Sequence, residues 1–189
     1  MRIAEITQQE TSDRARLISV ESYDIQLDLT GSAHTFGSVS VIRFSCCRPG
    51  AGSFADLIAQ TVHEITLNGT PLDPATAYAE GRILLPGLAE HNELRVVADC
   101  AYTSDGSGLH RTVDSADGKV YTFTQFEPAD ARKVYANFEQ PDLKAEFTFH
   151  ITAPAHWIVL SNQPAPDPVP SGDGAAVWHF ATRRECPPT

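Results

Sequence analysis

The clearest hydrophobic pattern in the chain is an alternation with a period of two residues. Over residues 23–29, apolar side chains alternate with Asp24, Gln26 and Asp28. This spacing is typical of a β-strand with one face in the core and the other in water. The dense apolar set at 39–44 predicts a strand that is buried on both faces or that contains a bulge. Strands are also predicted at 36–47, 62–67, 83–85, 94–102, 120–126, 147–152, 157–160 and 177–181.

Two helices interrupt this pattern. Thr7 and Glu10 have the spacing of a capping box, which predicts a helix over residues 7–17. Because polar and charged residues dominate this segment, we expect it to lie on the surface. A second, internal helix is predicted over residues 129–138, since Pro128 can start a helix and Pro141 cannot continue one.

Turn residues complete the predicted architecture. Asn68-Gly69 is typical of a type I′ hairpin turn, and Pro71 after it favours an edge strand. Residues 163–174, rich in Pro, Gly and Asp, are predicted to be a loop. The sequence therefore predicts a mostly β fold, a curved, saddle-like sheet-on-sheet β-sandwich with an N-terminal helix and one short internal helix. Residues 1–189 are expected to form a single domain.

Charge and composition narrow the choice of partners. The formal net charge is −10, which disfavours nucleic acid as a partner. No apolar run approaches the roughly 20 residues that span a bilayer, and no signal peptide is apparent, so we expect no membrane association. The four cysteines form no Cys-x-x-Cys pair, which favours free thiols in the cytoplasm and no metal bound by this chain.

Several candidate motifs lack the residues that their chemistry needs. His63-Glu64 is followed by Leu67 where a zinc helix of the type His-Glu-x-x-His requires a second histidine. The loop 105–108 lacks the Gly-Lys-Ser/Thr of a phosphate-binding loop and is interpreted as a connection between strands. We therefore assign no catalytic and no metal-binding residue to this chain.

The most informative polar pair is Gln125 and Glu127, at the end of the strand predicted at 120–126. Residues two apart in a strand point to the same face. From the residues alone, the pair is explained by an exposed polar face that a turn closes at Pro128, or by a binding site.

At this point several motifs resemble the aminopeptidase N family of zinc metallopeptidases. Thr124-Gln125-Phe126-Glu127 resembles the Thr/Ser-Gln-x-Glu motif of the family's leading domain, and residues 138–147 resemble its Phe-Asp-Glu-Pro-x-x-Lys-Ala-x-Phe. Residues 21–29, 108–111, 160–162 and 178–181 also match segments of that domain in the same order, and the details are most similar to actinobacterial members. Departures occur at Asn137, at Glu139-Gln140 and at His110, and they put local packing in doubt more than the fold.

The resemblance implies a role for the polar pair. In the family, a carboxylate of the leading domain binds the α-ammonium group of the substrate peptide, and the matching residue here is Glu127. Gln125 matches a residue that lines the pocket for the first side chain of the substrate. The resemblance also implies a zinc ion in the full-length enzyme. The family's zinc helix and Gly-x-Met-Glu-Asn motif are absent here, so residues 1–189 are interpreted as the non-catalytic N-terminal domain, with the missing catalytic domain as partner.

Two other functions remain open from the sequence. The chain could be a stand-alone β-sandwich module that binds carbohydrate or protein, with Trp157 and Trp178 as an aromatic platform, although both tryptophans lie in predicted core strands. A degenerate homologue that acts in assembly is the third candidate.

Overall fold

Strands dominate the computed structural model, which describes residues 5–185. The strands are β1 (Ile18–Asp28), β2 (Thr35–Cys46), β3 (Ser53–Asp56), β4 (Thr61–Leu67), β5 (Thr70–Leu72), β6 (Tyr78–Ala79), β7 (Arg82–Leu85), β8 (His91–Ala101), β9 (Gly108–Val113), β10 (Val120–Gln125), β11 (Ala145–Pro154), β12 (Val169–Gly172), β13 (Ala175–His179) and β14 (Arg183–Glu185). The helices are α1 (Gln8–Leu17), α2 (Pro74–Ala77) and the single 3₁₀ turn η1 (Ala131–Lys133). The predicted mostly β class with an N-terminal helix is confirmed.

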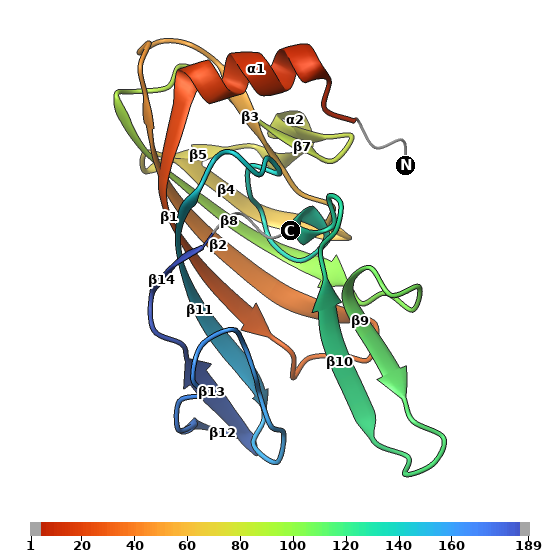
Figure 1. Ribbon diagram of the computed structural model, residues 1–189. Coiled ribbons are helices and arrows are strands. Elements are labelled where there is room, and N and C mark those ends of the chain that lie inside the picture. Colours follow the sequence, from red (N-terminus) through yellow and green to blue (C-terminus); the bar gives the residue numbers. More distant parts are fainter. Residues whose placement is uncertain (1–4, 186–189) are drawn as a thin grey trace.

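Nine strands form one large mixed sheet. Its order is β12-β13-β11-β1-β2-β8-β4-β5. The ninth strand, β14, pairs with residues 145–147 of β11, whereas β13 pairs with residues 150–154. The pairing of β1 with β11 is parallel, and every other pair in the described part of the sheet is antiparallel. Figure 1 shows this sheet twisting through the molecule, with α1 near one end and the separate β9–β10 ribbon projecting at the other.

The core lies between the large sheet and a smaller sheet of β3, β7 and β6. Ala55 of β3 and Ile83 of β7 belong to the same buried cluster as Ile25 and Ile42 of the large sheet. This contact confirms the sheet-on-sheet arrangement. A second, smaller buried cluster contains Ala153 of β11, Ala176 and Trp178 of β13, and Phe180.

A bulge in β1 brings two sets of apolar residues onto one face. The register with β2 shifts between Val20 and Ser22. As a result Ile18 and Val20, and then Tyr23 and the alternate residues after it, are all buried. A strict period of two would have placed one of these sets in water.

The predicted turn signals are confirmed at the β4–β5 hairpin. Asn68 and Gly69 both have positive φ, at 52° and 77°, as a two-residue type I′ turn requires. β5, which contains Pro71, is an edge strand of the large sheet. In β2, residues 36–46 alternate regularly between fully buried and less buried positions, so the bulge considered for residues 39–44 is not present there. The register shift between β1 and β2 lies instead at Val20–Ser22 of β1, which was not predicted.

The internal helix expected over residues 129–138 is shorter than predicted. Only η1 is helical in this segment, because later backbone groups bond to distant partners. The N–H of Ala136 donates to Ser40 Oγ at 3.0 Å, and the N–H of Phe138 donates to Tyr23 Oη at 3.1 Å. Tertiary hydrogen bonds therefore replace the helical ones that the local composition favours.

Two other predictions near the C-terminal part are wrong. Residues 157–160 are not a strand, and Ile158 and Leu160 are 86% and 76% exposed. The predicted loop 163–174 contains β12, an edge strand whose Pro170 obscured it in the sequence. The chain also forms β9, which was not predicted.

Candidate functional site

The strand β10 delivers Gln125 and Glu127 to the surface. Phe126, between them, packs edge-on against the buried ring of Tyr135, with ring centroids 5.9 Å apart. Gln125 and Glu127 are both exposed, and Gln125 Oε1 accepts a hydrogen bond from the N–H of Glu127 at 3.0 Å. Phe126 thus anchors the strand end to the core while its two polar neighbours remain accessible.

A tight turn follows Glu127. The peptide bond between Glu127 and Pro128 is cis, and the N–H of Asp130 donates to the carbonyl oxygen of Phe126 at 2.8 Å. The chain then enters η1 directly. The two polar side chains therefore lie at a tight turn, and the chain becomes buried at Ala131, the first residue of η1.

The start of β9 supports this turn from the other side. Lys133 of η1 contacts both Asp130, at 2.8 Å, and Ser107 Oγ, at 2.8 Å. Gly108 lies so close to η1 that an added Cβ would be 2.9 Å from Lys133 Cβ, and its φ of +58° also favours glycine. The motif 108–111 is thus a packing contact between β9 and the turn that carries Glu127.

The outer part of the β9–β10 ribbon carries exposed apolar side chains. Phe123 is 51% exposed and stacks on His110, with ring centroids 4.7 Å apart. Tyr121 and Val113 are also exposed. Since β10 alternates, Tyr121, Phe123 and Gln125 share one face of the ribbon.

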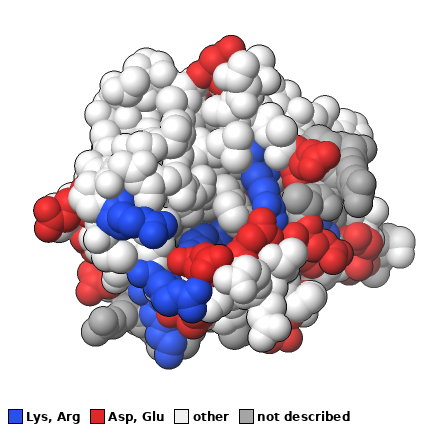
Figure 2. All heavy atoms as spheres, turned by 90° about the horizontal axis from the view of Figure 1, so that it is seen from above, with Lys and Arg blue, Asp and Glu red and all other residues white. Residues whose placement is uncertain are grey.

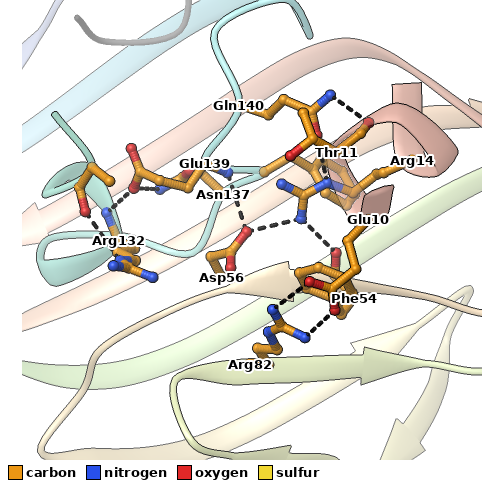
Figure 3. A network of polar contacts seen from close by, with 12 residues as sticks. Glu10, Thr11, Arg14, Phe54, Asp56, Arg82, Arg132, Asn137, Glu139 and Gln140 are labelled. Carbon is orange, nitrogen blue, oxygen red and sulfur yellow. Dashed lines mark hydrogen bonds and ion pairs between the residues drawn. The ribbon is translucent and has the colours of Figure 1, made fainter. Parts of the chain in front are cut away.

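A buried polar network holds the segment after η1 to α1 and β3 (Figure 3). The guanidinium group of Arg14 donates to Asp56 Oδ2 at 2.9 Å, to Gln140 Oε1 at 2.9 Å and to the carbonyl oxygen of Phe54 at 3.2 Å. It also lies over the Phe54 ring, 4.6 Å from its centroid. The expectation that α1 lies wholly on the surface is therefore wrong at Arg14.

Glu139 lies next to this network. It accepts a hydrogen bond from the N–H of Arg132 at 2.6 Å, and its own N–H donates to Asp56 Oδ2 at 3.3 Å. Burial raises the pKa of Glu139 to about 7. Asn137 and Gln140, the neighbouring departures from the family pattern, are both buried and hydrogen-bonded.

A hollow of about 620 Å³ lies beside α1, away from the polar pair. Glu10, Asp13, Arg16 and Arg48 contribute to its lining, and neither Gln125 nor Glu127 does. Figure 2 shows that basic and acidic side chains alternate over this end of the molecule and do not form a patch of one sign. The hydrogen bond from Arg82 holds the pKa of Glu10 at about 2, and Asp13 pairs with Arg16.

Within residues 5–185, no group of three or more His, Cys, Asp or Glu side chains is arranged to hold a metal ion. His63 instead contacts Asp99, at 2.8 Å between Nε2 and Oδ2. None of the described helices has the length and apolar character needed to cross a bilayer.

Sequence reasoning found the exposed pair but missed the residues that support it. Arg14 lies 40 residues before Phe54 and 42 before Asp56, and no spacing rule connects α1 to β3. The signal available in the sequence was the match over residues 138–147, which contains Glu139 and Gln140. The roles of Gln125 and Glu127 toward a substrate stay predictions at this stage.

Known proteins resemble this chain over nearly its whole length. Residues 19–188 match the family model of the peptidase M1 N-terminal domain. The chain is 52% identical to aminopeptidase N of Streptomyces lividans over 178 residues, which cover 93% of this chain and 20% of that protein. It is 28% identical to aminopeptidase M1-A of rice over 204 residues, covering 96% of this chain and 23% of that protein.

The chain thus spans about a fifth of the length of these relatives. The resemblance to actinobacterial members is confirmed by the Streptomyces match, which extends over nearly the entire chain. With this match, and with residues 19–188 covered by the family model, the chain belongs to the peptidase M1 N-terminal domain family.

Proposed function

We propose that this chain is the non-catalytic leading domain of a zinc aminopeptidase that removes N-terminal residues from peptides. Relatives that share the domain carry the name aminopeptidase, and the chain covers only about a fifth of their length. Its partners are then peptides with a free N-terminus and a catalytic domain outside residues 1–189. Among residues 5–185, no group of three or more potential ligands is arranged as the ligand set of a catalytic zinc ion, so zinc, which would polarise water and the scissile carbonyl, is assigned to the catalytic domain.

In this proposal Glu127 binds the α-ammonium group of the substrate, and Gln125 lines the pocket for its first side chain. The observation that carries the assignment is the pair of exposed polar side chains on a strand end that Phe126 anchors in the core. A carboxylate gives a charge-assisted hydrogen bond to an ammonium group, which is stronger than a neutral one. The Gln125 amide can donate to and accept from a peptide backbone.

The apolar face beside the pair supports the proposed partner. Tyr121 and Phe123 are exposed on the same face of the ribbon as Gln125. A catalytic domain that covers them would enclose Gln125 and Glu127 at the border of the contact. Such enclosure excludes water and strengthens the ammonium–carboxylate interaction.

A kinetic test of Glu127 uses the full-length enzyme. Glu127→Ala should lower kcat/KM for peptides with a free N-terminus by about 2–3 kcal/mol or more, because the charge-assisted hydrogen bond is lost. Glu127→Gln, which keeps a hydrogen-bonding group but no charge, should fall between the wild type and Glu127→Ala. Glu90→Gln makes the same charge change at an exposed position before β8 and serves as the control. Wild-type kinetics in Glu127→Ala would remove Glu127 from the site.

The remaining assignments concern compartment and other partners. We infer a cytoplasmic location from the cysteines, since Cys46, Cys47 and Cys100 are free thiols and thiols persist in reducing compartments. The net charge of −10 supports neither a nucleic-acid nor a membrane-surface role. The stand-alone binding module is disfavoured because Trp178 is buried at 3% exposure and offers no platform.

A further inference from the structure

Three neighbouring strands of the large sheet bring two imidazoles and a carboxylate together on one face. His150 of β11 and His179 of β13 are direct partners in the antiparallel register. Their Nδ1 atoms lie 2.7 Å apart. Asp24 of β1 lies on the other side of His150, with 3.7 Å between Asp24 Oδ2 and His150 Nε2. The cluster is separate from Gln125 and Glu127, which follow β10 outside this sheet.

The hydrogens on these rings limit what the cluster can do. A neutral imidazole carries one N–H and one lone pair, so one of the two facing Nδ1 atoms donates and the other accepts. The Asp24 carboxylate favours a hydrogen on His150 Nε2, which leaves the lone pair of His150 on Nδ1. His179 can place its hydrogen on Nε2 as well, because its ring is exposed to water. Both Nδ1 lone pairs would then face the same point.

That point suits a divalent transition metal. Imidazole nitrogens bind Zn²⁺ at about 2.0–2.1 Å, so two of them on a tetrahedral ion stand about 3.3 Å apart. The observed 2.7 Å needs to widen by only about 0.6 Å. Asp24 adds a negative charge, and its Oδ1 is buried without a hydrogen-bond partner among the described residues. Water would supply the remaining ligands, since the protein offers only two.

We propose that His150 and His179 form a two-imidazole site for a divalent transition metal of the Cu²⁺ or Zn²⁺ class, with Asp24 as the supporting carboxylate. The bound ion joins β11 to β13, near the edge of the large sheet. The preference for Cu²⁺ over Zn²⁺ follows the general order of affinities for nitrogen ligands.

The test is a titration of the purified 189-residue chain with Cu²⁺ and, separately, Zn²⁺, followed by calorimetry. Cys47, an exposed free thiol, and Cys186 are replaced by serine in every variant, so that thiolates do not compete. We expect one equivalent of metal, and a Cu²⁺ electron paramagnetic resonance spectrum with nitrogen coupling from two imidazoles.

Matched variants decide the outcome. His150→Gln and His179→Gln should each abolish the site, while Asp24→Asn should weaken it by about tenfold, as for other carboxylates that support a ligating histidine. His63→Gln is the control, because His63 also lies beside a carboxylate, that of Asp99, but contacts no second histidine within residues 5–185. Circular dichroism checks that each variant is folded. Unchanged affinity in His179→Gln, or an equal loss in His63→Gln, would overturn the proposal.

Discussion

At the scale of single residues, Glu139 is a carboxyl group whose surroundings oppose its ionised form. Burial raises its pKa from the ordinary 4.5 to about 7. The folded chain therefore holds this proton more tightly than the unfolded chain. The resulting contribution to stability is complete below about pH 4.5 and is lost as the pH rises through about 7.

We expect the free energy of unfolding to include a loss of roughly 2–3 kcal/mol between pH 5 and pH 8 that depends on Glu139. Urea denaturation of the wild type and Glu139→Gln at the two pH values measures it. The glutamine variant should lack this component, whereas Glu21→Gln, at an exposed carboxyl, should keep it. An equal pH dependence in wild type and Glu139→Gln would show that Glu139 is not the titrating group.

The residues of the candidate site differ in how far the sequence could reveal them. Gln125 and Glu127 were found because they lie two apart in a strand and in a family motif. Arg14 and Asp56 were not, because they are 42 residues apart and their contact depends on how α1 packs on β3. In a mostly polar helix, nothing distinguishes buried Arg14 from exposed Arg16. Local pattern therefore identifies surface chemistry better than the buried network that supports it.

At the scale of elements, Arg14 is the buried residue of α1 and bonds the helix to Phe54 and Asp56 of β3. Arg14→Ala would leave Asp56 buried without its cation, so we expect a loss of about 3–5 kcal/mol in unfolding free energy. Arg16→Ala in the same helix removes an exposed pair with Asp13 and should cost less than about 1 kcal/mol. Thermal or urea unfolding compares the two variants. Similar losses from both would contradict the role assigned to Arg14.

The junction between β9 and η1 gives a second prediction at this scale. In Gly108→Ala, the new Cβ would lie 2.9 Å from Lys133 Cβ, on a backbone with positive φ. We expect this substitution to lower the free energy of unfolding by about 1–3 kcal/mol. Gly118→Ala, with φ of +70° and open space around it, separates backbone strain from the contact. Denaturation midpoints of the two variants provide the measurement. A loss no greater than that of Gly118→Ala would mean that the contact with η1 is easily relieved.

Elements were predictable where one local signal determined them. The period of two identified β1, and Asn68-Gly69 identified the β4–β5 turn, because both depend on neighbouring residues. The helix expected over 129–138 failed because Ser40 and Tyr23, distant in the chain, accept its backbone hydrogens. The apolar run at 157–160 is not a strand: Trp157 and Val159 pack against the cluster around Trp178, whereas Ile158 and Leu160 are exposed.

At the scale of the whole molecule, the proposed function assigns catalysis to a domain outside residues 1–189. The purified 189-residue chain should therefore show no aminopeptidase activity toward a chromogenic amino-acid amide, even with added Zn²⁺. Activity that a chelator removes would contradict the assignment of catalysis to a separate domain. The full-length enzyme, assayed under the same conditions, is the positive control.

The parallel pairing of β1 with β11 has a consequence for how the chain is made. β1 begins at Ile18, whereas its central neighbour β11 begins at Ala145. While the ribosome synthesises the residues between them, β1 presents an unpaired edge that can bind another nascent chain. Closing such a long-range contact is slow. The edge of β1 that pairs with β11 in the folded domain therefore stays open until β11 has been synthesised.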